Sequence, residues 1–137
     1  MEIKKVVVIG SGTMGSGIAA HLCNANIPVT LLDLKTEISE QARDKIYKSR
    51  PPLLLDKSKI KNIKVGNILD NFDEVKKADW VVEAVVERID IKHDIYKKIF
   101  KERKKGAIVS SNTSSIPIKI LSQHLSEEEK KDFCITH

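Results

Sequence analysis

Four groups of residues in this sequence are of types, and at spacings, that suit chemistry. Near the amino end lies the glycine pattern Gly10-Ser11-Gly12-Thr13-Met14-Gly15. Asp33 closes the second apolar run, a hydroxyl and amide cluster spans Ser111–Ser115, and the last residue is His137. The glycines suit phosphate binding, the carboxylate suits sugar hydroxyls, the cluster suits polar ligand atoms, and the imidazole suits proton transfer.

The glycine pattern predicts a phosphate-binding turn because of its context. It directly follows residues 6–9, a β-branched run typical of a strand buried on both faces, and it precedes a helical pattern. Gly10 allows a tight turn, and Gly12 lets the backbone approach a pyrophosphate. Gly15 lets the helix lie close against the strand.

The first turn of the helix completes this expected phosphate site. Its unpaired N–H groups, including those of Thr13 and Met14, and the positive end of the helix dipole favour a phosphate. We expect Gly17, further along the helix, to add close packing. The alternative is a glycine-rich turn that binds no ligand.

Asp33 follows the second expected strand, residues 29–32. A carboxylate there can accept hydrogen bonds from both hydroxyls of an adenosine ribose and repels a 2′-phosphate, which favours NAD over NADP. Lys35 works against this selectivity, because a cation nearby can accommodate that phosphate. Capping a helix is the alternative role for Asp33, and the two roles are compatible.

The elements that must position these residues alternate along the chain. Apolar runs typical of strands lie at 6–9, 29–32, 63–65, 80–86, 107–110 and 133–136, with helical patterns between them. This alternation predicts an α/β fold: a Rossmann-type, doubly wound, mainly parallel sheet of about six strands with helices on both faces. We expect one NAD-binding domain over residues 1–137.

In such a sheet, ligands bind beyond the carboxyl ends of the strands, near the point where strand order reverses. Glu87 follows the expected strand at 80–86, and the hydroxyl cluster follows the next strand. Asn112 and Ser114 in that cluster can bond a nicotinamide ribose or a substrate oxygen. The alternative is ordinary turn and cap chemistry, which Ser and Asn supply in many proteins.

The composition excludes several classes of protein. Of 137 residues, 41% are hydrophobic and 31% charged, which is typical of a globular chain and not of a disordered one. Cys23 and Cys134 form no disulfide framework and favour a reducing cytoplasm. No apolar run approaches the roughly 20 residues of a membrane helix. The net charge of +5 comes with only six aromatic residues, so we expect neither a nucleic-acid nor a membrane partner. The histidine spacing predicts no metal site.

Three motifs in this order resemble the NAD-binding domain of L-3-hydroxyacyl-CoA dehydrogenases: Gly10–Ala19, Val81–Glu87 and Ser111–Ser115. The resemblance runs from Val6 to the last residue. The next motif of that family is His-Phe-Phe-Asn-Pro, and Phe133–His137 matches its approach and its histidine. Because the C-terminal helical domain of the family is absent, we expect this chain to be the front part of a longer protein.

The resemblance implies an oxidoreductase of fatty-acid β-oxidation, which transfers a hydride from C3 of a 3-hydroxyacyl-CoA to NAD⁺. It implies that His137 is the catalytic base and that Ser114 contacts the substrate and the nicotinamide region. It places Glu87 and Lys92 near the cofactor. It also implies two partners, an acyl-CoA substrate and a downstream helical domain or fragment.

The orienting carboxylate of the histidine lies downstream in that family, so we expect residues 1–137 alone to bind NAD without efficient turnover. One alternative is a non-catalytic NAD-binding module or the remnant of a split gene. Another is a different hydroxyacid dehydrogenase with the same nucleotide fold, which the Asn112–Ser115 cluster disfavours.

Overall fold

A computed structural model describes all 137 residues of the chain. The strands are β1 (Val6–Ile9), β2 (Val29–Asp33), β3 (Ile63–Asn67), β4 (Trp80–Glu83), β5 (Ile108–Ser111) and β6 (Phe133–Ile135). The α-helices are α1 (Thr13–Asn24), α2 (Thr36–Lys48), α3 (Ile89–Glu102), α4 (Ile118–Leu121) and α5 (Glu127–Lys130). Two 3₁₀ helices, η1 (Lys57–Asn62) and η2 (Phe72–Lys77), complete the structure.

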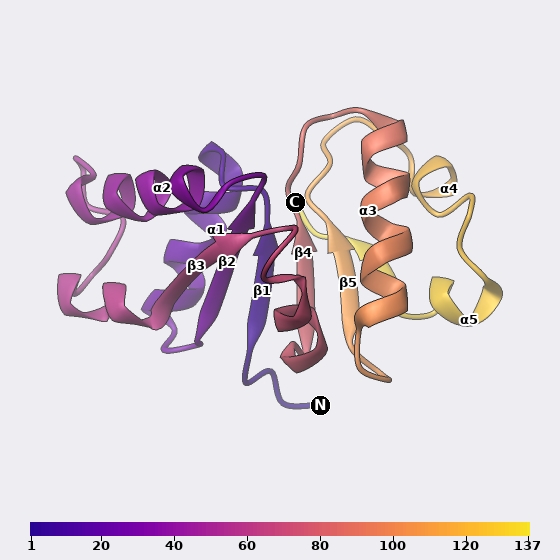
Figure 1. Cartoon of the computed structure of the whole chain (residues 1–137), viewed down its shortest axis with the longest axis horizontal. Helices are drawn as coiled ribbons and strands as arrows, with labels where there is room; N and C mark the ends of the chain where they lie inside the picture. The colour runs from indigo at the N-terminus through magenta and orange to yellow at the C-terminus, as the bar shows by residue number, and fades with distance from the viewer.

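The strands form one parallel sheet in the order β3-β2-β1-β4-β5-β6 (Figure 1). The chain starts at the centre with β1, runs outward to β3, returns to β4 and runs outward again to β6. Strand order therefore reverses between β1 and β4, which are paired with Val6 opposite Trp80. This topology confirms the Rossmann-type, doubly wound sheet that the sequence predicts.

The two faces of β1 pack into two different cores. Val6 and Val8 belong to a cluster with α1 and α2 on one face of the sheet, whereas Val7 and Ile9 belong to a cluster with α3 and α4 on the other. All four side chains are completely buried, and burial of each contributes about 1.5–3 kcal/mol relative to exposure. The prediction of a strand buried on both faces is confirmed.

The ends of the helices follow from local chemistry. α1 stops where Asn26 takes a left-handed backbone conformation with φ of 63°. α5 begins with a capping box, in which Ser126 and Glu129 each bond the other's backbone N–H. α4 begins at Ile118, with Pro117 as its N-cap.

The run at 80–86 is strand only as far as Glu83, which corrects the predicted length. Beyond that residue the neighbouring strands end. The N–H of Ala84 still donates to the carbonyl of Ile9 on β1 at 2.8 Å, and the backbone then bonds within the loop. The N–H of Val85 donates to the carboxylate of Glu83 at 2.9 Å, and the N–H of Arg88 donates to the carbonyl of Val86 at 2.8 Å. The apolar residues 84–86 therefore form a loop over the carboxyl end of the sheet, where they can line a site.

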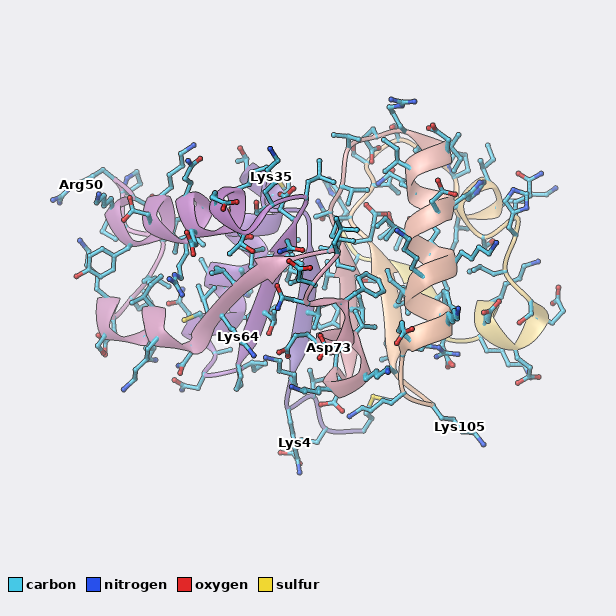
Figure 2. All side chains as sticks on the ribbon, in the orientation of Figure 1. Lys4, Lys35, Arg50, Lys64, Asp73 and Lys105 are labelled. Atoms are coloured by element: carbon cyan, nitrogen blue, oxygen red, sulfur yellow. The ribbon has the colours of Figure 1, made fainter.

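Many lysines project into solvent, as Lys4 and Lys105 do at the lower edge of Figure 2. None of the helices in the structure combines the length and apolar character needed to cross a bilayer.

Candidate dinucleotide-binding site

The glycine turn joins β1 to α1 with little room for side chains. Gly10 has a φ of +104°, and a Cβ there would clash with the carbonyl of Ala84 at the end of β4. A Cβ at Gly15 would clash with the carbonyl of Gly10, so α1 lies directly against the turn. At Gly12, by contrast, a Cβ would have nothing within 4 Å. The turn thus leaves open space beside the first N–H groups of α1.

The structure contradicts the expectation that Gly17 adds close packing. A Cβ at this position would also meet nothing within 4 Å, so Gly17 does not serve close packing. It lines a cavity instead.

A cavity of about 500 Å³ lies beside the glycine turn. Its lining comes from the turn and the start of α1, the ends of β2 and β3, the loop after β4 and the first half of α3: Gly10, Ser11, Gly12, Thr13, Met14, Asp33, Leu34, Ile68, Ala84, Val85, Val86, Ile91 and Ile95. These residues meet at the reversal of strand order, where Rossmann-type sheets bind their ligands. Five of the predicted cofactor residues therefore share one largely apolar cavity.

Asp33 is held in place by the turn. Its Oδ2 accepts hydrogen bonds from both the N–H and the hydroxyl of Ser11, at 2.8 and 2.5 Å, and its Oδ1 accepts from the N–H of Leu34 at 2.7 Å. The N-cap residue of α2 is Lys35, so Asp33 does not cap that helix. The carboxylate is only half-buried and is free to accept further hydrogen bonds from the cavity.

A buried charged network lies under the loop after β4. The carboxylate of Glu83, which is completely buried, accepts hydrogen bonds from Lys92 Nζ at 2.6 Å, from Ser111 Oγ at 2.7 Å and from the hydroxyl of Tyr96. Burial, and then the charge of Glu83, raise the pKa of Tyr96, so this hydroxyl stays a donor. The network joins β4, α3 and β5.

Glu87 extends the network to the surface. Its Oε1 lies 3.0 Å from Lys92 Nζ, and its Oε2 accepts from Thr113 Oγ1 at 2.7 Å and Ser115 Oγ at 3.1 Å. Burial raises the pKa of Glu87, but the bonds from Thr113 and Lys92 outweigh it and leave the pKa below its usual value. The loop after β4 is therefore tied to the loop after β5 on both sides of Ser114.

The structure places Lys92 beneath Glu87 instead of in the cavity. Its side chain is 1% exposed and its ammonium is occupied by the two carboxylates. Lys92 therefore contacts Glu83 and Glu87 and does not line the cavity.

A second cavity, of about 590 Å³, lies on the other face of the sheet. Asn112 and the exposed His137 line it together, with Gly17, Trp80 and Thr136. The end of the chain lies near the carboxyl ends of β1 and β4 (Figure 1), and Thr136 is held on β5 by its N–H, which donates to the carbonyl of Ser111 at 2.9 Å. Ser114 is exposed and lines neither cavity.

Sequence reasoning missed Ser11, Glu83 and Tyr96. One signal was present for the network: the buried stripe of α3 comprises Lys92, Ile95, Tyr96 and Ile99. A lysine in an apolar stripe requires buried carboxylate partners, and Glu83 stands in the preceding strand.

The strand order, the glycine turn and the acidic residue that closes β2 together define a Rossmann-type dinucleotide-binding domain. The family described as 3-hydroxyacyl-CoA dehydrogenase, NAD binding domain, matches residues 5–137. The chain belongs to this family, and NAD is the cofactor of the family's domain.

Similar proteins are longer than this chain. A probable 3-hydroxyacyl-CoA dehydrogenase of Deinococcus radiodurans is 40% identical over all of this chain, which spans 42% of that relative. A peroxisomal fatty acid beta-oxidation multifunctional protein of Arabidopsis thaliana is 37% identical over 93% of this chain and 18% of its own length. The crystal structure of 3-hydroxybutyryl-CoA dehydrogenase from Escherichia coli matches the whole chain with a TM-score of 0.86 and 25% identity, over 30% of that chain. This chain thus corresponds to less than half of each of these relatives.

Proposed function

We propose that residues 1–137 bind NAD in the cavity beside the glycine turn, as the cofactor-binding part of a 3-hydroxyacyl-CoA dehydrogenase. One observation carries the proposal: Gly12, with open space where a side chain would be, and the anchored carboxylate of Asp33 line the same cavity. A pyrophosphate fits the first, and a ribose diol fits the second.

The residues around the cavity suit the two ends of a dinucleotide differently. Asp33 offers carboxylate oxygens to the adenosine ribose, and the N–H groups of Thr13 and Met14 face the pyrophosphate. The apolar loop 84–86 leads away from Asp33 towards Glu87 and the cluster after β5. We assign the nicotinamide end to that side, with Asn112 and Ser114 as hydrogen-bonding groups.

NAD⁺, when bound, supplies the acceptor for a hydride. The chain's own contribution to the chemistry is a base: the imidazole of His137, the type of side chain that most often takes up a proton in catalysis. His137 and Asn112 line one cavity, which supports an acyl-CoA substrate on that face of the sheet. Ser114 lies on the adjoining loop as a further substrate contact.

Three further parts belong to the same proposal. A downstream helical domain, of the kind that the length of the relatives allows, would complete the substrate site. The reaction would be 3-hydroxyacyl-CoA oxidation in fatty-acid β-oxidation. The location would be the cytoplasm, which the two free cysteines support.

The proposal is tested by calorimetric titration of the chain with NADH and with NADPH. We expect wild type to prefer NADH by about tenfold or more, equivalent to about 1.4 kcal/mol. Asp33→Ala should weaken NADH binding and abolish the preference. Asp44→Ala, which removes an exposed carboxylate of α2 paired with Lys48, is the matched control and should bind as wild type does. Equal wild-type affinity for the two cofactors would contradict the role of Asp33.

A further inference from the structure

The network of Glu83, Lys92 and Glu87 holds more negative than positive charge. Two carboxylates share one ammonium, at 2.6 and 3.0 Å, which leaves a net charge of −1. The other ionisable groups nearby do not offset it. Tyr96 donates to Glu83 as a neutral phenol, and Arg88 is paired with Asp90 at 2.9 Å on the exposed side of the loop.

This charge is fixed in position. Glu83 is fully buried among its donors, and Glu87 is held by Lys92, Thr113 and Ser115, although 42% of its side chain remains exposed. A preorganised charge acts on a neighbouring ligand more strongly than a mobile one, because no reorganisation precedes the interaction.

The network also lies at one particular end of the cavity. Lys92 Nζ is 3.5 Å from the carbonyl of Val85, which lines the cavity, and Glu87 follows Val86, which lines it too. Asp33 lies at the end of β2, two strands away from β4 in the sheet. Under the proposed function, on which this inference rests, the end at Glu87 receives the nicotinamide ring.

We propose that Glu83, Lys92 and Glu87 form an anionic positioning network that favours the oxidised cofactor, whose nicotinamide ring is cationic, over the neutral ring of NADH. Glu83 and Lys92 do not touch the ligand; they set the position and net charge of Glu87. The expected ligand preference is electrostatic, so it follows the charge of the network and not merely its shape.

The test measures the affinities of NAD⁺, NADH and ADP-ribose by calorimetry, for wild type, Glu83→Gln and Glu87→Gln. Both variants neutralise one carboxylate with little change in size. Each should weaken NAD⁺ relative to NADH by about threefold or more. Neither should change the affinity of ADP-ribose, which lacks the ring. Glu87→Asp keeps the charge and should retain most of the wild-type ratio.

Glu74→Gln is the matched control, because Glu74 is also a buried glutamate paired with a lysine, Lys64, at 2.5 Å. That pair lies towards the amino ends of the strands, near the labelled Lys64 and Asp73 in Figure 2 and away from Lys35. Its loss should leave the NAD⁺ to NADH ratio unchanged.

The outcomes separate this inference from the proposed function. An unchanged ratio in Glu87→Gln would overturn the inference while NAD binding stands, and this variant keeps the test decisive even if Glu83→Gln fails to fold. An equal loss of NAD⁺, NADH and ADP-ribose would also overturn it, since the network would then be only structural. Wild type that binds none of the three would overturn the proposed function and this inference with it.

Discussion

The N–H and the hydroxyl of Ser11 both donate to the same oxygen of Asp33, Oδ2, at 2.8 and 2.5 Å. Ser11 lies within the glycine turn and Asp33 at the end of β2, so one contact joins the two parts of the proposed adenosine site. Ser16 extends the link, because its hydroxyl donates to the carbonyl of Ser11 at 2.8 Å. The carboxylate is thereby oriented before any ligand arrives.

Ser11→Ala should weaken NADH binding by about three- to tenfold, because one of the three hydrogen bonds that orient Asp33 is lost, at about 0.5–1.5 kcal/mol. The backbone N–H of residue 11 remains, so discrimination against NADPH should be reduced but not abolished. Calorimetry with both cofactors checks this. A variant that binds NADH as tightly as wild type would show that the hydroxyl does not matter.

Gly12→Ala and Gly17→Ala form a matched pair, since an added Cβ at either position meets nothing within 4 Å. Both proteins should fold, and Gly17→Ala should gain up to about 1 kcal/mol from helix propensity. Only Gly12→Ala should lose dinucleotide binding, by about tenfold or more, because the methyl occupies the space of the pyrophosphate. Thermal melting and NADH titration of the two variants measure this, and equal NADH affinity in both would refute it.

Glu74 should stabilise the chain at neutral pH and lose that effect in acid. The hydrogen bond from Lys64 lowers the pKa of Glu74, against burial, which raises it. As the pH falls, the unfolded chain binds this proton first, near its ordinary pKa of 4.5, so the stabilising effect is complete above that pH and is lost as the pH falls through the lower folded value.

Glu74→Gln should therefore be less stable than wild type at pH 7, by about 1 kcal/mol. The difference should shrink at about pH 3, below the ordinary pKa of 4.5, where the unfolded chain already holds this proton. Urea unfolding at the two pH values measures it, with the exposed Asp44→Asn as control. A difference independent of pH would exclude the ion pair as its cause.

Residues 1–137 alone should show no NADH formation above background with NAD⁺ and 3-hydroxybutyryl-CoA. No side chain in the structure bonds the ring of His137, which is exposed, whereas catalysis requires a base held within about 0.5 Å. His137→Ala should be indistinguishable from wild type in a steady-state assay. Turnover that His137→Ala abolishes would show that the chain positions this base by itself.

The sheet could be predicted because its local signals agree. β1 is apolar at every position and is buried on both faces, which fits only a central parallel strand. The glycine turn could also be predicted. A side chain at Gly10 or Gly15 would clash with backbone atoms, so both positions require glycine. Neither 3₁₀ helix was predicted, because each is a single short segment without a clear period.

The buried network could be predicted only in part. Glu87 and Lys92 were identified by resemblance, and the apolar stripe of α3 indicates that Lys92 is buried, but nothing local shows that Glu83 is its partner. That pairing depends on how α3 crosses β4, which is a matter of tertiary packing. Gly17 was misjudged for the same reason: spacing along a helix does not reveal whether a neighbour or a cavity lies opposite.

Thr13 and Met14 line both cavities, one on each face of the sheet. A substitution at either residue therefore alters two compartments at once, and a single kinetic or binding defect measured there has no unique origin. Gly17 borders only the compartment with His137, and Ile68 only the one with Asp33. Mutations that separate the two compartments therefore have to be made at residues that line only one of them, such as Gly17 and Ile68.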